Sequence, residues 1–216
     1  MIEGYPLMLN IAGRTCIVVG GGQVAARKVE GLLAARTRVI VISPIVTAAL
    51  RESIEQERIQ WIQQPYEPGL LTHYQPMLVF AATDDASINR QIAQEAKSIS
   101  AFVNVVDQLD MVDFINMAVI RRPPLTIALS SDGTSPALTH HLKTVIEQAV
   151  GEEYATLADW LNDLRPQVAH TGTQPERQQL YETLLNSDVP ALLRQNQTQA
   201  ARDHFQRVVQ AWETRS

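Results

Sequence analysis

Two hydrophobic patterns alternate along the first half of the chain. Short, mostly apolar runs are typical of buried strands, and the stretches between them place apolar residues every three or four positions, as on one face of a helix. The expected strands are residues 16–19, 39–42, 59–62, 77–82 and 101–106, and the expected helices are residues 24–35, 47–57 and 87–97. This alternation predicts an α/β fold with a parallel, doubly wound sheet.

The pattern changes after Asp107. Two further strands are expected at residues 114–120 and 125–129, separated by Arg121-Arg-Pro-Pro124, and a helix is expected from Pro136. The inner face of that helix would carry Leu138, Leu142, Val145, Ile146 and Ala149. Beyond it only helices are expected, at residues 153–164, 175–186, 191–196 and 198–214. We therefore divide the chain into an α/β domain (1–113), a small α+β segment (114–150) and an all-helical C-terminal domain (151–216).

The middle segment is too small to bury a core of its own, because two strands and one helix usually need a partner surface. We expect it to be a dimerisation segment that joins two copies of the chain into a homodimer.

The turn after the first apolar run carries the most specific chemical signal. Gly20, Gly22 and Ala25 match the G-x-G-x-x-G/A pattern of a dinucleotide-binding turn. Gly20 allows a sharp turn, Gly22 lets backbone N–H groups approach a diphosphate, and Ala25 keeps the following helix close to the sheet. The positive end of the helix dipole then faces the anion. This pattern identifies the first domain as a Rossmann domain.

Composition narrows the class of protein. The chain has 216 residues, 45% hydrophobic and 19% charged, as in ordinary globular proteins. Its net charge of -5 argues against broad nucleic-acid binding. No apolar stretch approaches the roughly 18 residues of a membrane span, and the residues after Met1 do not resemble a secretory signal. We expect a soluble cytoplasmic protein with no membrane partner. The single cysteine, Cys16, and the scattered histidines indicate neither a disulfide nor a resident metal.

Polar residues follow three of the expected strands. Ser43-Pro44 stands where an acidic residue usually binds the adenosine ribose, and no arginine follows it closely, so NAD is only mildly favoured over NADP. Thr83 and Asp84 are placed to contact the nucleotide, whereas Asp85 is favoured as a helix cap. Asp107 is equally consistent with a proton acceptor beside a nicotinamide and with a turn aspartate.

Anion-binding groups recur in the middle segment. Arg121 and Arg122 are either solvated strand ends or a basic pair that engages a polyanionic ligand. The loop 130–135 precedes a helix and offers hydroxyls and backbone donors to the same anion.

Taken together, these segments resemble the precorrin-2 dehydrogenase family, which also forms the N-terminal half of siroheme synthases. The matching pieces are Tyr5-Pro-Leu-Met-Leu9, Val18-Val-Gly-Gly-Gly22 with Val24-Ala25 and Arg27-Lys28, Ala82-Thr-Asp-Asp85 with Asn89, Asn104-Val-Val-Asp107 with Phe114, and Gly133-Thr-Ser-Pro136. The resemblance implies an NAD-binding Rossmann domain, a dimerisation segment and a helical domain. It also implies NAD-dependent oxidation of precorrin-2, a tetrapyrrole, to sirohydrochlorin in siroheme biosynthesis.

The resemblance makes Asp107 the expected catalytic general base. The residues expected to bind NAD are Gly20, Gly21, Gly22, Gln23, Val24, Ala25, Ser43, Pro44, Thr83, Asp84, Asn104 and Val105. The residues expected to bind the substrate are Arg121, Arg122, Ser130, Ser131, Gly133, Thr134 and Ser135. Two alternatives stay open: an enzyme that also inserts Fe2+ into sirohydrochlorin, and an NAD-sensing Rossmann module without turnover.

Overall fold

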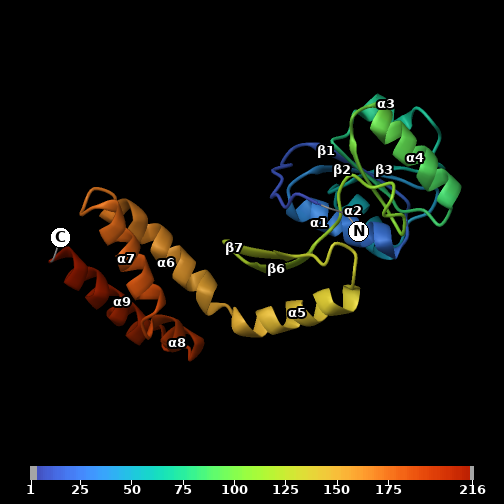
Figure 1. Ribbon diagram of the computed structural model, residues 1–216. Coiled ribbons are helices and arrows are strands. Elements are labelled where there is room, and N and C mark those ends of the chain that lie inside the picture. Colours follow the sequence, from blue (N-terminus) through green and yellow to red (C-terminus); the bar gives the residue numbers. More distant parts are fainter. Residues whose placement is uncertain (1–3, 215–216) are drawn as a thin grey trace. The chain divides into compact units, whose positions relative to one another are not determined.

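The computed structural model describes residues 4–214, so the first three residues of the N-terminal stretch considered above lie outside it. The chain forms two compact units, Met1–Asn116 and Met117–Ser216 (Figure 1). The boundary lies three residues after the end expected for the Rossmann domain, and residues 117–150 belong to the same unit as the helices that follow them.

The first unit contains a parallel sheet with helices on both faces, as the alternating pattern predicts. Its elements are β1 (Thr15–Val19), α1 (Gln23–Ala34), β2 (Arg38–Ile42), α2 (Ala48–Glu55), β3 (Gln60–Ile62), α3 (Leu70–Tyr74), β4 (Leu78–Ala81), α4 (Ala86–Ser98) and β5 (Phe102–Val105). The strand order is β3-β2-β1-β4-β5, and every pair is parallel. The order reverses between β1 and β4, so the crevice at their carboxyl ends is where a doubly wound sheet binds its ligand.

Side chains of each strand alternate between two apolar layers. Cys16, Val18 and Phe80 pack under α1 and α2 in one layer, and Ile17 and Val79 pack under α4 in the other. Burial on both faces explains why these strands read as continuous apolar runs. The spacing of Ile88, Ile92 and Ala96 predicts an apolar stripe on α4, and it is confirmed, since Ile92 and Ala96 are fully buried. The short helix α3 was not expected from the pattern.

The second unit begins with an antiparallel hairpin of β6 (Ala118–Arg122) and β7 (Leu125–Leu129). The prediction of a strand at 114–120 was wrong in its start, and Arg121 and Arg122 lie in β6 rather than in a connection. Residues 113–114 are held by β5 instead. Asp113 exchanges two hydrogen bonds with the backbone of Val103 (2.8 and 2.9 Å), and the Asn104 side chain donates to the Phe114 carbonyl (2.9 Å).

The helix α5 (Pro136–Ala149) starts at its expected residue, but its expected inner face is not buried. Leu138, Leu142 and Val145 are 50%, 42% and 46% exposed, and none of the residues of α5 is buried. The prediction of a buried face was wrong because, within the described residues, the neighbouring β6 covers this helix only in part.

The remaining helices pack on one another. They are α6 (Glu153–Val168), α7 (Gln174–Leu185), α8 (Val189–Arg194) and α9 (Thr198–Glu213), close to the expected ranges. Their core includes Leu157, Leu184 and Phe205. Within residues 4–214, no helix is long and apolar enough to cross a membrane.

An ion pair between the buried Glu153 and the half-exposed Arg194 joins the start of α6 to α8. The Arg194 guanidinium binds the Glu153 carboxylate and also donates to the Ala149 carbonyl (2.8 Å). Burial raises the pKa of Glu153, but the hydrogen bonds from Arg194 and the backbone outweigh it, so the net pKa is lowered. The pair therefore stabilises the fold at neutral pH and loses its effect as Glu153 becomes protonated.

We expect Arg194→Met to lower the free energy of unfolding by about 2 kcal/mol at pH 7, because Glu153 would be left buried without its partner while Arg194 itself is half-exposed. Urea unfolding of the full chain, followed by circular dichroism, measures this. The difference from wild type should shrink as the pH falls through the carboxyl range. It should be smallest below the lowered pKa of Glu153, where the variant lacks only the hydrogen bond to Ala149.

Arg207→Met is the matched control, since Arg207 is exposed on α9 and takes part in no ion pair among the described residues. An equal loss in both variants, or a loss that does not depend on pH, would contradict the role of the pair.

Candidate dinucleotide site

The turn after β1 fits tightly against the two neighbouring strand ends. Gly20 has φ of 127°, and a Cβ there would lie 2.2 Å from the Ala82 carbonyl oxygen, just after β4. A Cβ on Gly21 would lie 1.9 Å from the Ile45 carbonyl oxygen, in the loop after β2. The Gly21 carbonyl in turn accepts a hydrogen bond from the Thr47 N–H (2.9 Å). The first two glycines are therefore required by the packing of the chain on itself.

Gly22 is required by neither its own conformation nor its neighbours. Its φ of -82° suits any residue, and a Cβ there would meet nothing within 4 Å. Gly22 is the N-cap of α1, and no side chain caps this helix. The first N–H groups of α1, from Gln23 onward, are thus left without a side-chain cap, next to the open space at Gly22, which suits a diphosphate. Ala25 is fully buried against the sheet, as its place in the motif predicts.

The loop after β2 turns its polar atoms inward. Ser43 is buried, its hydroxyl donates to the Ile45 carbonyl (2.7 Å), and its own carbonyl accepts from the Trp61 indole N–H (2.9 Å). Pro44 and Ile45 are exposed beside it. Ser43 therefore shapes the turn, and the exposed part of this loop is apolar.

The loop after β4 is held by Asn89, a buried residue on α4. The Asn89 side chain donates to the Thr83 carbonyl (2.9 Å) and accepts from the Thr83 hydroxyl (2.7 Å). Sequence reasoning gave Asn89 no role of its own, although its place next to the apolar stripe of α4 marks it as a buried amide. Asp84 is exposed, with no polar partner among the described residues.

Asp85 caps α4, as expected. Its carboxylate accepts from the backbone N–H groups of Ser87 (2.7 Å) and Ile88 (3.3 Å) and from the Ser87 hydroxyl (2.7 Å). Hydrogen bonds from Ser87 and Ile88 lower the pKa of the Asp85 carboxyl. Asp84 is therefore the acid of this loop that is left for a ligand.

The residues at the end of β5 and just after it also divide into engaged and free side chains. Asn104 is buried and engaged with Phe114, and Val105 is buried in the core, so only its backbone faces the edge of the sheet. Asp107 is exposed, adopts a φ of 59°, and makes no polar contact among the described residues. Two strand spacings, about 10 Å, separate the ends of β1 and β5. Asp107 thus lies at the same edge as the glycine turn, with its carboxylate free.

Lys28 and Phe114, two further residues of the resemblance, pack on the same ring. The Lys28 ammonium lies 5.5 Å from the centroid of the Phe80 ring, and Phe114 meets that ring edge to face at 5.3 Å. Burial, with a smaller effect of Arg27, lowers the pKa of Lys28. These contacts help to hold the segment after Asp107 against β4.

The expected substrate residues lie in the second unit and are unequally available. Arg122 Nε lies 2.9 Å from the Glu152 carboxylate, whereas the exposed Arg121 side chain has no polar partner among the described residues. The Ser131 hydroxyl bonds Ser135 and Thr139, and the Ser135 hydroxyl caps α5. Ser130 bonds Asp132, while Gly133 and Thr134 complete an exposed turn.

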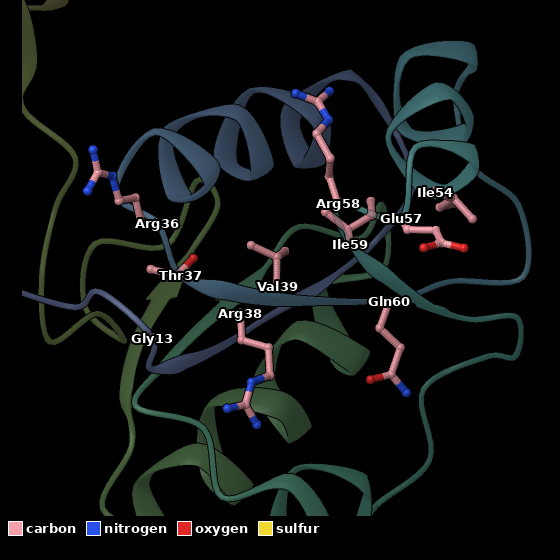
Figure 2. Close-up of a pocket in the computed structure, with 10 residues that line it drawn as sticks. All are labelled: Gly13, Arg36, Thr37, Arg38, Val39, Ile54, Glu57, Arg58, Ile59 and Gln60. Atoms are coloured by element: carbon pink, nitrogen blue, oxygen red, sulfur yellow. The ribbon is translucent and has the colours of Figure 1, made fainter.

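A cavity of about 550 Å3 lies at the opposite edge of the sheet, beside the amino ends of β2 and β3 (Figure 2). Arg36 and Arg58 point to one side of β2 and Arg38 points to the other, so the three guanidinium groups do not converge (Figure 2). Ligands of doubly wound sheets bind at the carboxyl ends. This cavity is therefore separate from the candidate site. Among the described residues, no group of three or more His, Cys, Asp or Glu is placed to hold a metal ion.

Comparisons with known proteins match both units. Residues 7–118 match a family model described as putative NAD(P)-binding, and residues 153–208 match one described as the sirohaem synthase dimerisation region. The second match lies in the helices α6–α9, after the segment 114–150 that is expected from the sequence to mediate dimerisation.

Similar proteins are longer than this chain. A siroheme synthase from Methylobacillus flagellatus is 35% identical over 209 residues, which cover 96% of this chain and 44% of that protein. One from Nitrosospira multiformis is 33% identical over 207 residues, 94% of this chain and 43% of that protein. This chain thus spans less than half of these relatives. The solved structure of SirC, precorrin-2 dehydrogenase, has a TM-score of 0.77 at 22% identity, covers 96% of this chain and all of its own, and supports the fold.

We expect Gly22→Asp to abolish dinucleotide binding without unfolding the protein, because the new carboxylate would occupy the space and oppose the charge of a diphosphate. Calorimetric titration measures the binding. Gly31→Asp is the matched control, since it adds the same charge to α1 at a position that also has nothing within 4 Å. Equal affinity in the two variants would contradict this placement of the dinucleotide.

Proposed function

The chain belongs to the putative NAD(P)-binding family, and from that premise we propose that it is an NAD-dependent dehydrogenase that oxidises precorrin-2 to sirohydrochlorin in siroheme biosynthesis. One observation carries the proposal: an uncapped glycine turn and an unpartnered carboxylate, Asp107, lie at the same edge of the sheet. The naming of its relatives as siroheme synthases supports the choice of substrate. We place the reaction in the cytoplasm as part of this proposal.

The glycine turn provides binding and orientation. The N–H groups at the start of α1 hold the diphosphate beside Gly22, and the exposed loop at Pro44 and Ile45 lies toward the adenosine side of the sheet. NAD+ supplies the hydride acceptor. The order β1-β4-β5 supports a nicotinamide position on the side of Asp107.

Asp107 takes the proton in this mechanism. Loss of a hydride from the macrocycle leaves a carbon or nitrogen that must also lose a proton to complete the new double bond, and a carboxylate at that position accepts it. Because Asp107 is exposed, the proton then passes to solvent. No internal hydrogen bond competes for its oxygens among the described residues.

Arg121 is the cation that we assign to the carboxylates of the substrate. Arg122 is paired with Glu152, whereas Arg121 has its guanidinium free among the described residues. The hydroxyls of Ser131 and Ser135 hold the loop 130–135 in shape, so the contribution of this loop to substrate binding would come from Thr134 and from backbone N–H groups.

We assign the homodimer contact to the second unit. Its apolar stripe on α5 is exposed, and its helices match the dimerisation-region model. A second copy of the chain would cover the stripe that the described residues leave open.

Incubation with precorrin-2 and NAD+ tests the proposed reaction. We expect NADH and sirohydrochlorin to form in equal amounts. Absence of NADH, with NAD+ still bound, would contradict the enzyme and favour a sensor. Addition of Fe2+ to the product then tests chelation, which would show as metal insertion faster than in a protein-free control.

Asp107→Asn should lower kcat about 100-fold, the usual contribution of one general base, and leave the Kd for NAD+ unchanged. Asn keeps the shape of the side chain and tolerates the positive φ, so the variant tests the charge alone. Asp110→Asn is the control, because Asp110 is another exposed acid in the segment after β5 and has no assigned role in the site. A rate near that of wild type for Asp107→Asn would remove this residue from the mechanism.

Size-exclusion chromatography with light scattering should give the mass of a dimer at micromolar concentration. Leu142→Glu should shift the mass toward that of a monomer, because it places a charge in the exposed stripe of α5. The control is Glu147→Gln, a change on the same helix outside the stripe. A monomeric wild type would contradict the dimer.

A further inference from the structure

The structure brings an arginine to the end of β2, where the sequence shows none close by. Arg51 lies in the first half of α2, and its guanidinium carbon is 5.7 Å from the centroid of the Trp61 ring in β3. The Trp61 indole N–H donates to the carbonyl of Ser43, the first residue after β2 (2.9 Å). An arginine eight residues along the chain is thus folded back toward the edge that normally binds the adenosine ribose.

The Arg51 guanidinium lies over the Trp61 ring, and none of its donors has a partner among the described residues. Arg51 is exposed, and none of the ion pairs within residues 4–214 involves it. A cation–π contact holds the guanidinium near the indole and leaves its N–H groups free to bind a ligand. This arrangement suits an anion with several oxygens, above all a phosphate.

No acidic residue lies in the loop after β2, where the ribose is normally bound. Residues 43–47 read Ser-Pro-Ile-Val-Thr and carry no charge. In NAD-specific Rossmann proteins, a carboxylate at this position binds the ribose 2′-hydroxyl, and it would repel a 2′-phosphate. The nearest acid on α2, Glu52, accepts from Gln56 on the next turn and lines the groove between α1 and α2. Discrimination against a 2′-phosphate is therefore missing.

A second polar group at this edge lacks a partner. The Thr47 hydroxyl oxygen is buried and has no hydrogen bond within the described part of the chain, while the Thr47 N–H donates to Gly21 in the glycine turn (2.9 Å). A buried hydroxyl without a partner is costly. Thr47 begins α2 and touches the turn itself, so a ligand oxygen at the start of α2 would complete its bonding.

We propose that Arg51, held on Trp61, binds the 2′-position of the adenosine ribose, and that this chain accepts NADP+ as well as NAD+. The inference rests on the dinucleotide site proposed above and adds the specificity of its adenosine end. Arg51, and not a carboxylate, then lies at the 2′-position of the ribose. It contacts the 2′-phosphate of NADP+ directly, whereas NAD+ offers it only a neutral hydroxyl.

Calorimetric titration of the full chain with NAD+ and with NADP+ tests the inference. The two Kd values of the wild type should lie within about tenfold of each other. Arg51→Gln should raise the Kd for NADP+ about tenfold, the value of one charge-assisted contact, and leave that for NAD+ unchanged. Because the lost contact is ionic and exposed, the wild-type affinity for NADP+ should also fall more steeply with salt than that for NAD+.

Arg38→Gln is the matched control, because Arg38 is an exposed arginine at the opposite edge of the sheet (Figure 2). It removes the same charge and should change neither Kd. If NAD+ binds but NADP+ binds more than about 100-fold more weakly, or if Arg51→Gln weakens both alike, the inference is wrong while the dinucleotide site stands. If neither dinucleotide binds, the proposed function fails and the inference fails with it.

Discussion

The fit of two glycines against two backbone carbonyls is the constraint on which the site depends. Gly20 lies against the carbonyl of Ala82, and Gly21 lies against that of Ile45. Both contacts are so close that a Cβ on either glycine would clash with the carbonyl oxygen. This contact brings the ends of β1, β2 and β4 to one point and aims the start of α1 at the space beside Gly22. Without it, the helix dipole and the loops that carry Asp84 and Thr47 would not converge on one ligand.

Polar residues at this edge divide into those that hold the chain and those that remain free. Three side chains form hydrogen bonds with the backbone of nearby loops, namely those of Ser43, Asn89 and Asn104. These bonds fix the path of the chain at each strand end. Asp107 and Arg51 have no polar partner among the described residues. Asp107 follows β5, and Arg51 lies over Trp61 in β3. In our account the first group builds the site and the second group meets the ligand.

The sequence predicts the sheet well and the use of its polar residues poorly. Five apolar runs and a glycine motif define the parallel sheet because burial on both faces leaves an unmistakable pattern, and the Asp85 cap follows from local chemistry. The geometry of the turn decides whether the Ser43 hydroxyl meets a ribose or the Ile45 carbonyl. The position of Arg51 near the end of β2 depends on Trp61, which lies in another strand. The stripe on α5 looks like any buried helix face, because periodicity shows that a face is apolar and not what covers it.

A crystal structure of the chain with NAD+ tests the central claim most directly. The account predicts diphosphate oxygens within hydrogen-bond distance of the backbone N–H groups of Gln23 and Val24, in the space beside Gly22, and a nicotinamide ring next to the Asp107 carboxylate. A diphosphate bound elsewhere, such as in the cavity at the amino ends of β2 and β3, or a nicotinamide remote from Asp107, would contradict it.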